Sequence, residues 1–161
     1  MAVESESTLA TFYKGWHDYQ TLVTRALAPL SAEQLALRAA PHLRSVEEIA
    51  THMIGARARW FHQLLGEGDQ EFAALGTWDR PGMPERGASE LVSALETTWR
   101  VMQEALARWT PAEWAQTYED DEEEEPVTRR WVVWHLVEHD LHHGGELSLT
   151  LGIHGVTALD L

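Results

Sequence analysis

Four histidines and one glutamate share a single face of the segment between Trp131 and Leu147. At about 100° per helical residue, their side chains fall within an arc of roughly 100°. The members of this group are His135, His139, His142, His143 and Glu146. Two histidines four residues apart on a helix can bind one divalent ion. The spacing therefore predicts a metal site here, and the pair His135 and His139 fits as well as the pair His139 and His143.

Another candidate ligand stands much earlier in the chain. His52 lies three residues after Ile49 and four before Ala56, beside an apolar stripe, so its ring can face the interior. Burying several imidazoles without partners is costly, and a shared metal ion removes that cost. We expect the other histidines to be surface or ordinary core residues, because their spacing offers no partner: His17, His42, His62 and His154.

Long helices must position these side chains. Apolar residues recur at steps of three and four in four segments, which predicts helices over about 5–28, from Ser45 to near Gly66, from after residue 87 to Thr110, and over about 128–151. Capping-box patterns at 31–34 and 110–113 predict a short capped turn after the first and third helices. No segment alternates with a period of two, so we expect essentially no sheet.

The connections complete the predicted architecture. Residues 66–87 hold five glycines and two prolines, which favours a long crossover without a helix. Two helical hairpins joined in this way form an all-α, up-down-down-up four-helix bundle, here a single domain over residues 1–161. The acidic run 119–125 lacks the spaced ligands of an EF-hand and is expected to be a solvated loop.

Composition excludes several classes of function. Lys and Arg number 12 against 26 for Asp and Glu in 161 residues, a net charge of -14, which disfavours nucleic acids and anionic membranes as partners. Cysteine is absent, so the chain offers no disulfide, thiolate ligand or thiol nucleophile of its own. The acidic, polar start is unlike a signal peptide, and no apolar run is long enough to span a membrane, so we expect a cytoplasmic protein.

The segment His139-Asp-Leu-His-His-Gly-Gly-Glu146 resembles the HxxHHRGQ element of the DinB/YfiT-like metal-binding four-helix bundles. Residues 128–131, which lead into this segment, are also typical of that family. The resemblance implies that His52, His139 and His143 are the metal ligands. The sequence departs from the element at Gly144, where arginine is usual, and at Glu146, where glutamine is usual, so a role for that arginine in anchoring an anionic substrate or a subunit does not carry over.

The resemblance also implies a function. Characterised members of the family include S-transferases that use mycothiol or bacillithiol and a thiol-dependent maleylpyruvate isomerase. We therefore expect a divalent ion (Zn, Ni or Fe) to activate an external low-molecular-weight thiol for attack on a small electrophile. A homodimer is a further expectation from the family.

Two other functions fit the same residues. One is hydrolysis by metal-bound hydroxide; the other is a non-catalytic binding protein whose metal staples the bundle through a fourth protein ligand, such as His135 or Glu146. Carboxylates near the ligands can orient their N–H groups or move protons. Glu138, Asp140 and Glu146 are the candidates, and Glu146 has the best angular position and is the predicted catalytic residue.

Overall fold

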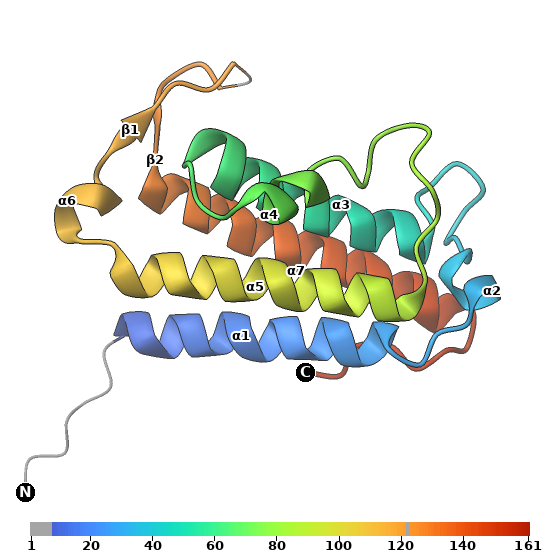
Figure 1. Ribbon diagram of the computed structural model, residues 1–161. Coiled ribbons are helices and arrows are strands. Elements are labelled where there is room, and N and C mark those ends of the chain that lie inside the picture. Colours follow the sequence, from blue (N-terminus) through green and yellow to red (C-terminus); the bar gives the residue numbers. More distant parts are fainter. Residues whose placement is uncertain (1–7, 122) are drawn as a thin grey trace, which may run out of the picture.

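The computed structural model describes residues 8–121 and 123–161. Four long helical segments lie alongside one another (Figure 1): α1 (Thr8–Leu27), α3 (Val46–Ala58) with its π-helical continuation η1 (Arg59–Leu64), α5 (Ala88–Arg108) and α7 (Arg129–Ile153). The predicted, mainly helical fold class is confirmed. The predicted helix start at residue 5 and the acidic N-terminal segment lie outside the described residues. Among the described residues, we find no helical segment that combines the length and the hydrophobicity of a membrane span.

Capping boxes begin several helices where the sequence predicts them. The short helices α2 (Ala32–Leu35) and α6 (Pro111–Trp114) follow α1 and α5, and each begins with a complete capping box. Ser45 caps α3 in the same way, accepting a hydrogen bond from the Glu48 amide while the Glu48 carboxylate accepts one from the Ser45 amide. Each cap satisfies amide groups that would otherwise lack partners at a helix start.

The crossover between α3 and α5 contains a helix that the sequence analysis excluded. This helix, α4 (Gln70–Leu75), starts at Asp69, whose carboxylate accepts a hydrogen bond from the Phe72 amide at 2.9 Å. Phe72 and Leu75 are buried and anchor it to the bundle. The prediction of a crossover without a helix is therefore wrong, because one side-chain cap and two buried residues stabilise a helix between the glycines.

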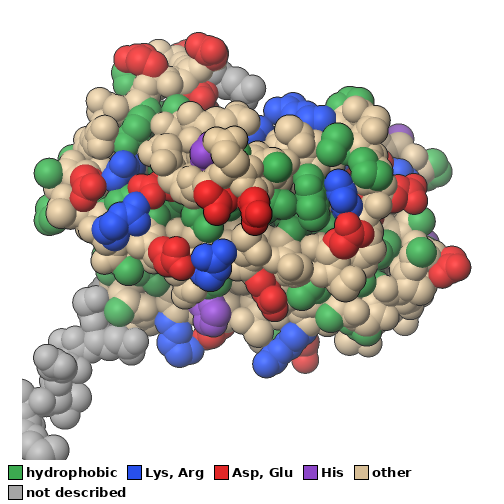
Figure 2. Space-filling view, viewed as in Figure 1, with side chains coloured by type: hydrophobic (Ala, Val, Ile, Leu, Met, Phe, Trp, Pro, Cys, Tyr) green, Lys and Arg blue, Asp and Glu red, His purple; other side chains and the backbone are tan. Residues whose placement is uncertain are grey.

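The structure also contains a small sheet, contrary to the expectation of none. Strand β1 (Thr117–Tyr118) pairs antiparallel with β2 (Val127–Thr128), with Thr117 opposite Thr128. Two-residue strands are too short to show a period of two in the sequence. Acidic side chains gather on the connection between these strands, which projects at the top of Figure 2. The described residues of the acidic run therefore lie on a surface loop, as expected.

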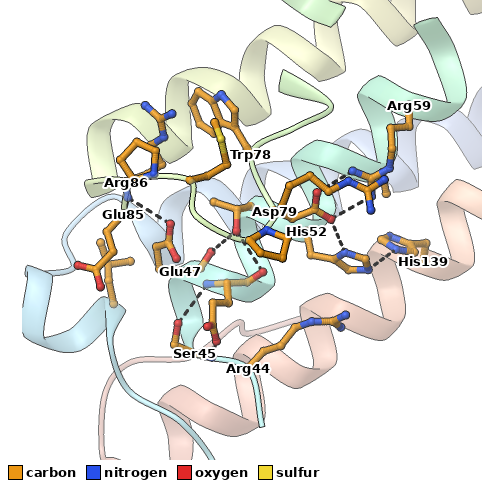
Figure 3. Close-up of a pocket in the computed structure, with 18 of the residues that line it drawn as sticks. Arg44, Ser45, Glu47, His52, Arg59, Trp78, Asp79, Glu85, Arg86 and His139 are labelled. Atoms are coloured by element: carbon orange, nitrogen blue, oxygen red, sulfur yellow. Dashed lines mark hydrogen bonds and ion pairs between the residues drawn. The ribbon is translucent and has the colours of Figure 1, made fainter. Parts of the chain in front are cut away.

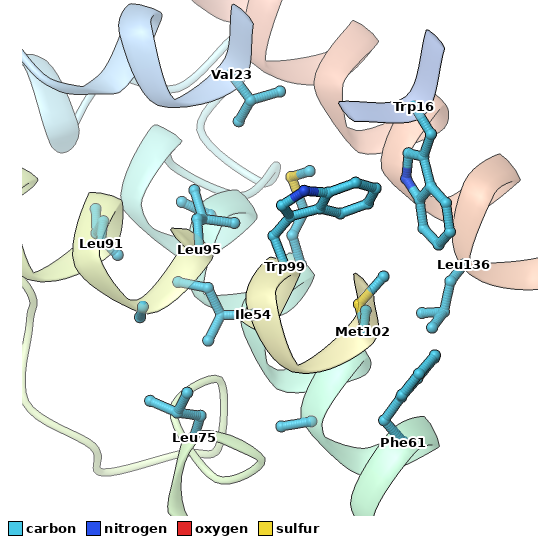
Figure 4. Close-up of a cluster of buried hydrophobic side chains, with 14 of the residues drawn as sticks. Trp16, Val23, Ile54, Phe61, Leu75, Leu91, Leu95, Trp99, Met102 and Leu136 are labelled. Carbon is cyan, nitrogen blue, oxygen red and sulfur yellow. The ribbon is translucent and has the colours of Figure 1, made fainter. Parts of the chain in front are cut away.

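The apolar core forms where the four long helices meet (Figure 4). Trp16 and Trp99 pack edge to face, with ring centroids 5.0 Å apart. Around them lie buried aliphatic and aromatic residues from all four long segments, including Val23, Ile54, Phe61, Leu95, Met102 and Leu136. Helix α3 packs against both α5 and α7, so it is the central element of the bundle.

A buried ion pair joins α3 to α7 inside this core. The side chains of Arg57 and Asp140 have relative exposures of 0% and 1%. Arg57 donates to both carboxylate oxygens, at 2.7 and 3.1 Å, and the Trp16 indole N–H donates to the same carboxylate at 2.7 Å. Arg57 also donates to the Thr98 hydroxyl at 3.3 Å and to the Leu95 carbonyl at 3.4 Å. Residues of α1, α3, α5 and α7 thus meet in one polar network.

We predict that Asp140→Leu destabilises the protein by about 3–5 kcal/mol, because it leaves the Arg57 guanidinium buried without a counter-charge. Urea unfolding followed by circular dichroism measures this loss. The double variant Arg57→Met/Asp140→Leu removes both charges and should recover most of the stability. Equal stability of the single variant and the wild type would contradict the assignment.

Candidate metal centre

Three of the predicted histidines converge between α3 and α7. His52, His139 and His143 each offer one ring nitrogen, and these atoms lie within 4.8 Å of one another. The Nε2 atoms of His52 and His139 are 3.2 Å apart, and Figure 3 shows the two rings facing each other. Two nitrogen ligands of one tetrahedral ion, each at about 2.0–2.1 Å, lie about 3.4 Å apart. The group could therefore hold a metal ion.

Burial keeps these imidazoles neutral. Desolvation is the main cause that lowers the pKa of His52 and of His143. Desolvation, followed by the charges of His143 and His52, lowers the pKa of His139 from 6.5 to about 2. Neutral imidazole is the form that binds a metal, so the environment of all three rings favours ligation at neutral pH.

Two carboxylates orient two of the three rings. The Nδ1 atom of His52 lies 2.8 Å from Asp79 Oδ2, and the Nδ1 atom of His143 lies 2.6 Å from Glu146 Oε2. An ionised carboxylate accepts a hydrogen bond from Nδ1–H, which leaves the Nε2 lone pair for a metal. Burial raises the pKa of each carboxyl, but hydrogen bonds lower it on balance, from Arg59 and His52 to Asp79 and from His143 to Glu146. Both carboxylates are therefore suited to this role.

His139 lacks such a partner. Within the described part of the chain, its Nδ1 atom is buried and makes no hydrogen bond, while its Nε2 faces His52. If the ring proton is on Nδ1, the Nε2 lone pair points at the centre of the cluster. The Nε2 lone pairs of His52 and His139 then point at each other and repel, and a cation bound between them would remove this repulsion. The ring arrangement thus fits a metal ion.

Asp79 is the site residue that the sequence analysis missed. It follows α4 in the crossover, and Arg59 of η1 holds it with two hydrogen bonds of 2.7 and 2.9 Å. Arg59 also donates to the Gly76 carbonyl at 2.7 Å, so the crossover is tied to the π-helical segment. No motif marks Asp79 in the sequence. The contact depends on how the crossover folds back over α3.

The remaining candidates lie outside the three-histidine group. His135 contacts Glu138 at 3.2 Å and stacks on Trp131, so Glu138 does not orient a ring of the group. Asp140, proposed as an acceptor for a ligand, instead belongs to the buried ion pair with Arg57. His142 is exposed and forms, with His143 and Glu146, a second group whose ligand atoms also lie within 4.8 Å of one another. The four other histidines join neither group.

A cavity of about 1570 Å³ opens over His52 and His139. Its walls come from the α2–α3 connection, from α3 and η1, and from the crossover, including Arg44, Trp60 and Trp78. Cavities that bind small molecules usually measure about 300–1,000 Å³. This cavity therefore has room for more than one small molecule beside the histidines.

Gly144 has a packing role at the α1–α7 contact. A Cβ atom at this position would overlap the side chain of Tyr19, whose hydroxyl donates to the Leu141 carbonyl at 3.3 Å. Position 144 thus faces α1. A larger residue here, such as the arginine of the HxxHHRGQ element, would displace Tyr19.

Comparison with models of protein families identifies the family of this chain. The model of the DinB family matches residues 1–160. The chain belongs to the DinB family. A search of curated proteins finds no match to this member.

Solved structures share the fold of this DinB family member. A DinB-like protein from Bacillus cereus is 20% identical with a TM-score of 0.74, over 98% of this chain and 99% of that chain. A conserved protein from Enterococcus faecalis is 14% identical with a TM-score of 0.68, over 92% and 99%. A DinB-like protein (YjoA) from Bacillus subtilis is 18% identical with a TM-score of 0.64, over 91% and 93%. At these identities the likeness concerns the fold alone.

We predict that Asp79→Asn lowers the metal affinity of the protein about 10–100-fold, because His52 loses an ionised acceptor for its Nδ1–H. Competition with a chromogenic chelator measures the affinity. Asp18→Asn removes an exposed carboxylate on α1 that pairs with Lys14 and should leave the affinity unchanged. Equal effects of the two substitutions would show that Asp79 acts only through net charge.

We predict that the lowered pKa of His139 reduces the free energy of unfolding of the metal-free protein by about 2 kcal/mol when the pH falls from 7 to 5. The unfolded chain protonates this residue near its ordinary pKa of 6.5, whereas the folded ring stays neutral down to about pH 2. The unfolded state therefore binds more protons, and stability falls as the pH falls. Urea unfolding with chelator at each pH measures the slope, which His139→Leu should reduce. An unchanged slope in that variant would contradict the prediction.

Proposed function

We propose that this protein is a metal-dependent enzyme that activates an external low-molecular-weight thiol for attack on a small electrophile. The observation that carries the proposal is the group of three neutral imidazoles beside an open cavity. A divalent ion (Zn, Ni or Fe) bound by His52, His139 and His143 would lower the pKa of a thiol enough to make it a nucleophile near neutral pH. Because the chain has no cysteine, the thiol must come from outside.

The surrounding residues have separable roles in this proposal. Asp79 and Glu146 fix the tautomers of His52 and His143 through their Nδ1 atoms. The Glu146 side chain is 42% exposed, so it also reaches solvent and is our candidate for accepting the thiol proton. The indole side chain of Trp60 forms an apolar wall of the cavity next to the histidines. The cavity volume suits a reaction that brings two small molecules together.

Hydrolysis is the second candidate function. The exposure of Glu146 beside His143 supports it, because a carboxylate at that place can also take a proton from water. A purely structural metal is less well supported. Structural zinc sites normally have four protein ligands, whereas the described residues bring only three histidines together around one point, and His135 is occupied by Glu138.

We also propose that the four long helices follow an up-down-down-up order and that the protein forms a homodimer. Figure 1 supports an up-down-down-up order, with α1 and α7 running one way, α3 and α5 the other, and residues 66–87 as the crossover. Exposed apolar side chains on α1 and α7 are consistent with a partner copy; they are Leu9, Phe12, Trp134, Leu141, Leu149 and Ile153. Sedimentation analysis measures the oligomeric state.

We predict that protein purified without a histidine tag carries one divalent ion per chain, and that His52→Ala, His139→Ala and His143→Ala each abolish it. Elemental analysis measures the stoichiometry, and circular dichroism checks that each variant is folded. His154→Ala is the matched control, because His154 contacts the Arg38 carbonyl outside the cluster and its loss should leave the metal in place. Full metal content in any of the three cluster variants would contradict the assigned ligand set.

The reaction itself is tested with monochlorobimane as the electrophile and a panel of low-molecular-weight thiols. We expect thiol consumption that stops when a chelator is added and returns with the metal. A chelator that lowers the melting temperature without any thiol being consumed in the loaded protein would reject the transferase and favour a structural metal.

A further inference from the structure

Two arginines of the cavity wall, Arg44 and Arg80, form no ion pair within the described part of the chain, and Arg44 is the one whose charge acts on the histidine cluster. Three other arginines in the wall are paired: Arg38 with Glu48 at 2.6 Å, Arg59 with Asp79 at 2.7 Å, and Arg86 with Glu90 at 3.2 Å. Within the described part of the chain, the Arg44 guanidinium makes neither a hydrogen bond nor an ion pair. Figure 3 shows it extended along the cavity toward His52 and His139.

The backbone holds Arg44 in this place. The next residue, Ser45, is the capping residue of α3, and it also forms a bridge with Arg38. The Cα atom of Arg44 is therefore held by the capped start of α3, while its long side chain can adopt several rotamers. The guanidinium is near enough to the cluster for its charge to lower the pKa of both His52 and Glu146. The charge of Arg44 thus acts on a ligand from α3 and on the carboxylate that contacts a ligand from α7.

The charge of Arg44 is unfavourable for the site unless an anion joins it. A guanidinium beside three imidazoles that bind a divalent ion repels that ion. The Glu146 carboxylate, whose pKa the Arg44 charge lowers, offsets only part of this repulsion, and its oxygens also contact His143 and His142. A ligand that carries an oxyanion a few bonds from its sulfur would place one negative charge on the guanidinium and its sulfur on the divalent ion. Guanidinium groups bind carboxylate and phosphate oxygens through two parallel hydrogen bonds.

We propose that Arg44 binds an oxyanion, a carboxylate or a phosphate, on the thiol that the site activates, and so selects acidic thiols over neutral ones. This inference rests on the proposed function. Arg44 acts as a specificity residue: it contacts the charged end of the ligand while the sulfur reaches the histidines. The cavity can accommodate such a ligand together with an electrophile.

The test compares 3-mercaptopropionate with its methyl ester, which carries the same thiol without the charge. Both are titrated into cobalt-loaded protein, and the sulfur-to-cobalt charge-transfer absorption gives the affinity of each. We expect Arg44→Ala to lower the ratio of acid affinity to ester affinity about fivefold, and Arg44→Lys to lower it less, because lysine keeps the charge but not the fork. The difference in thiol pKa between the two probes is the same for every variant, so it cancels when the ratio is compared between the wild type and a variant.

Two arginine variants serve as controls. Arg80 lines the cavity but is not among the main charges that shift the pKa of the three histidines, and Arg25 lies on α1 outside the cavity wall. Arg80→Ala and Arg25→Ala should leave the ratio unchanged. If either lowers it as much as Arg44→Ala does, the preference reflects the general charge of the protein and the assignment to Arg44 is wrong.

The remaining outcomes separate this inference from the proposed function. Thiol binding with the same ratio in the wild type and in Arg44→Ala overturns the inference and leaves the proposed function standing. If neither thiol changes the cobalt spectrum, the proposed function fails, and acetate is compared with acetamide by tryptophan fluorescence. A preference for acetate that Arg44→Ala removes then supports an oxyanion site; no preference overturns it. Competition by acetate against inorganic phosphate, at matched ionic strength, identifies which oxyanion binds better.

Discussion

The buried contact between Arg57 and Asp140 sets the position of α3 against α7. Arg57 lies five residues after His52 on α3, and Asp140 directly follows His139 on α7. Sliding α7 by one helical turn, about 5.4 Å, would separate both the ion pair and the two Nε2 atoms that lie 3.2 Å apart. The core polar network and the histidine cluster therefore depend on the same helix register. An apolar seam would tolerate small shifts more readily, because dispersion contacts have no fixed partner.

The candidate metal centre combines rigid and variable parts of the fold. Helices α3 and α7 supply all three imidazoles, so the spacing of the ligand atoms is set by packed secondary structure. The orientation of His52 comes instead from Asp79 in the crossover, which Arg59 holds in place. When the ligands lie on helices and a hydrogen-bond acceptor lies on a loop, substitutions in the loop can change the surroundings of a metal without moving the metal itself.

The sequence predicts those features that depend on local pattern. Three-four apolar spacing identifies the long helices, Ser45 and Thr128 mark their starts, and the stripe of histidines on α7 indicates where polar groups face inward. Features that depend on distant contacts escape such reasoning. Helix α4 is stabilised by burial of Phe72 against the bundle, and Asp79 reaches His52 only because the crossover folds over α3.

Tyr19 and Gly144 constrain how this chain can diverge. The Tyr19 hydroxyl lies against α7 where position 144 has no side chain, so any larger residue there would collide with the phenol ring. Arginine at position 144 would require Tyr19 to move aside or to be replaced by a smaller residue, whereas loss of the tyrosine alone would leave a gap between the helices. The sizes of the side chains at positions 19 and 144 are therefore coupled, so a bulky residue at one position favours a small residue at the other.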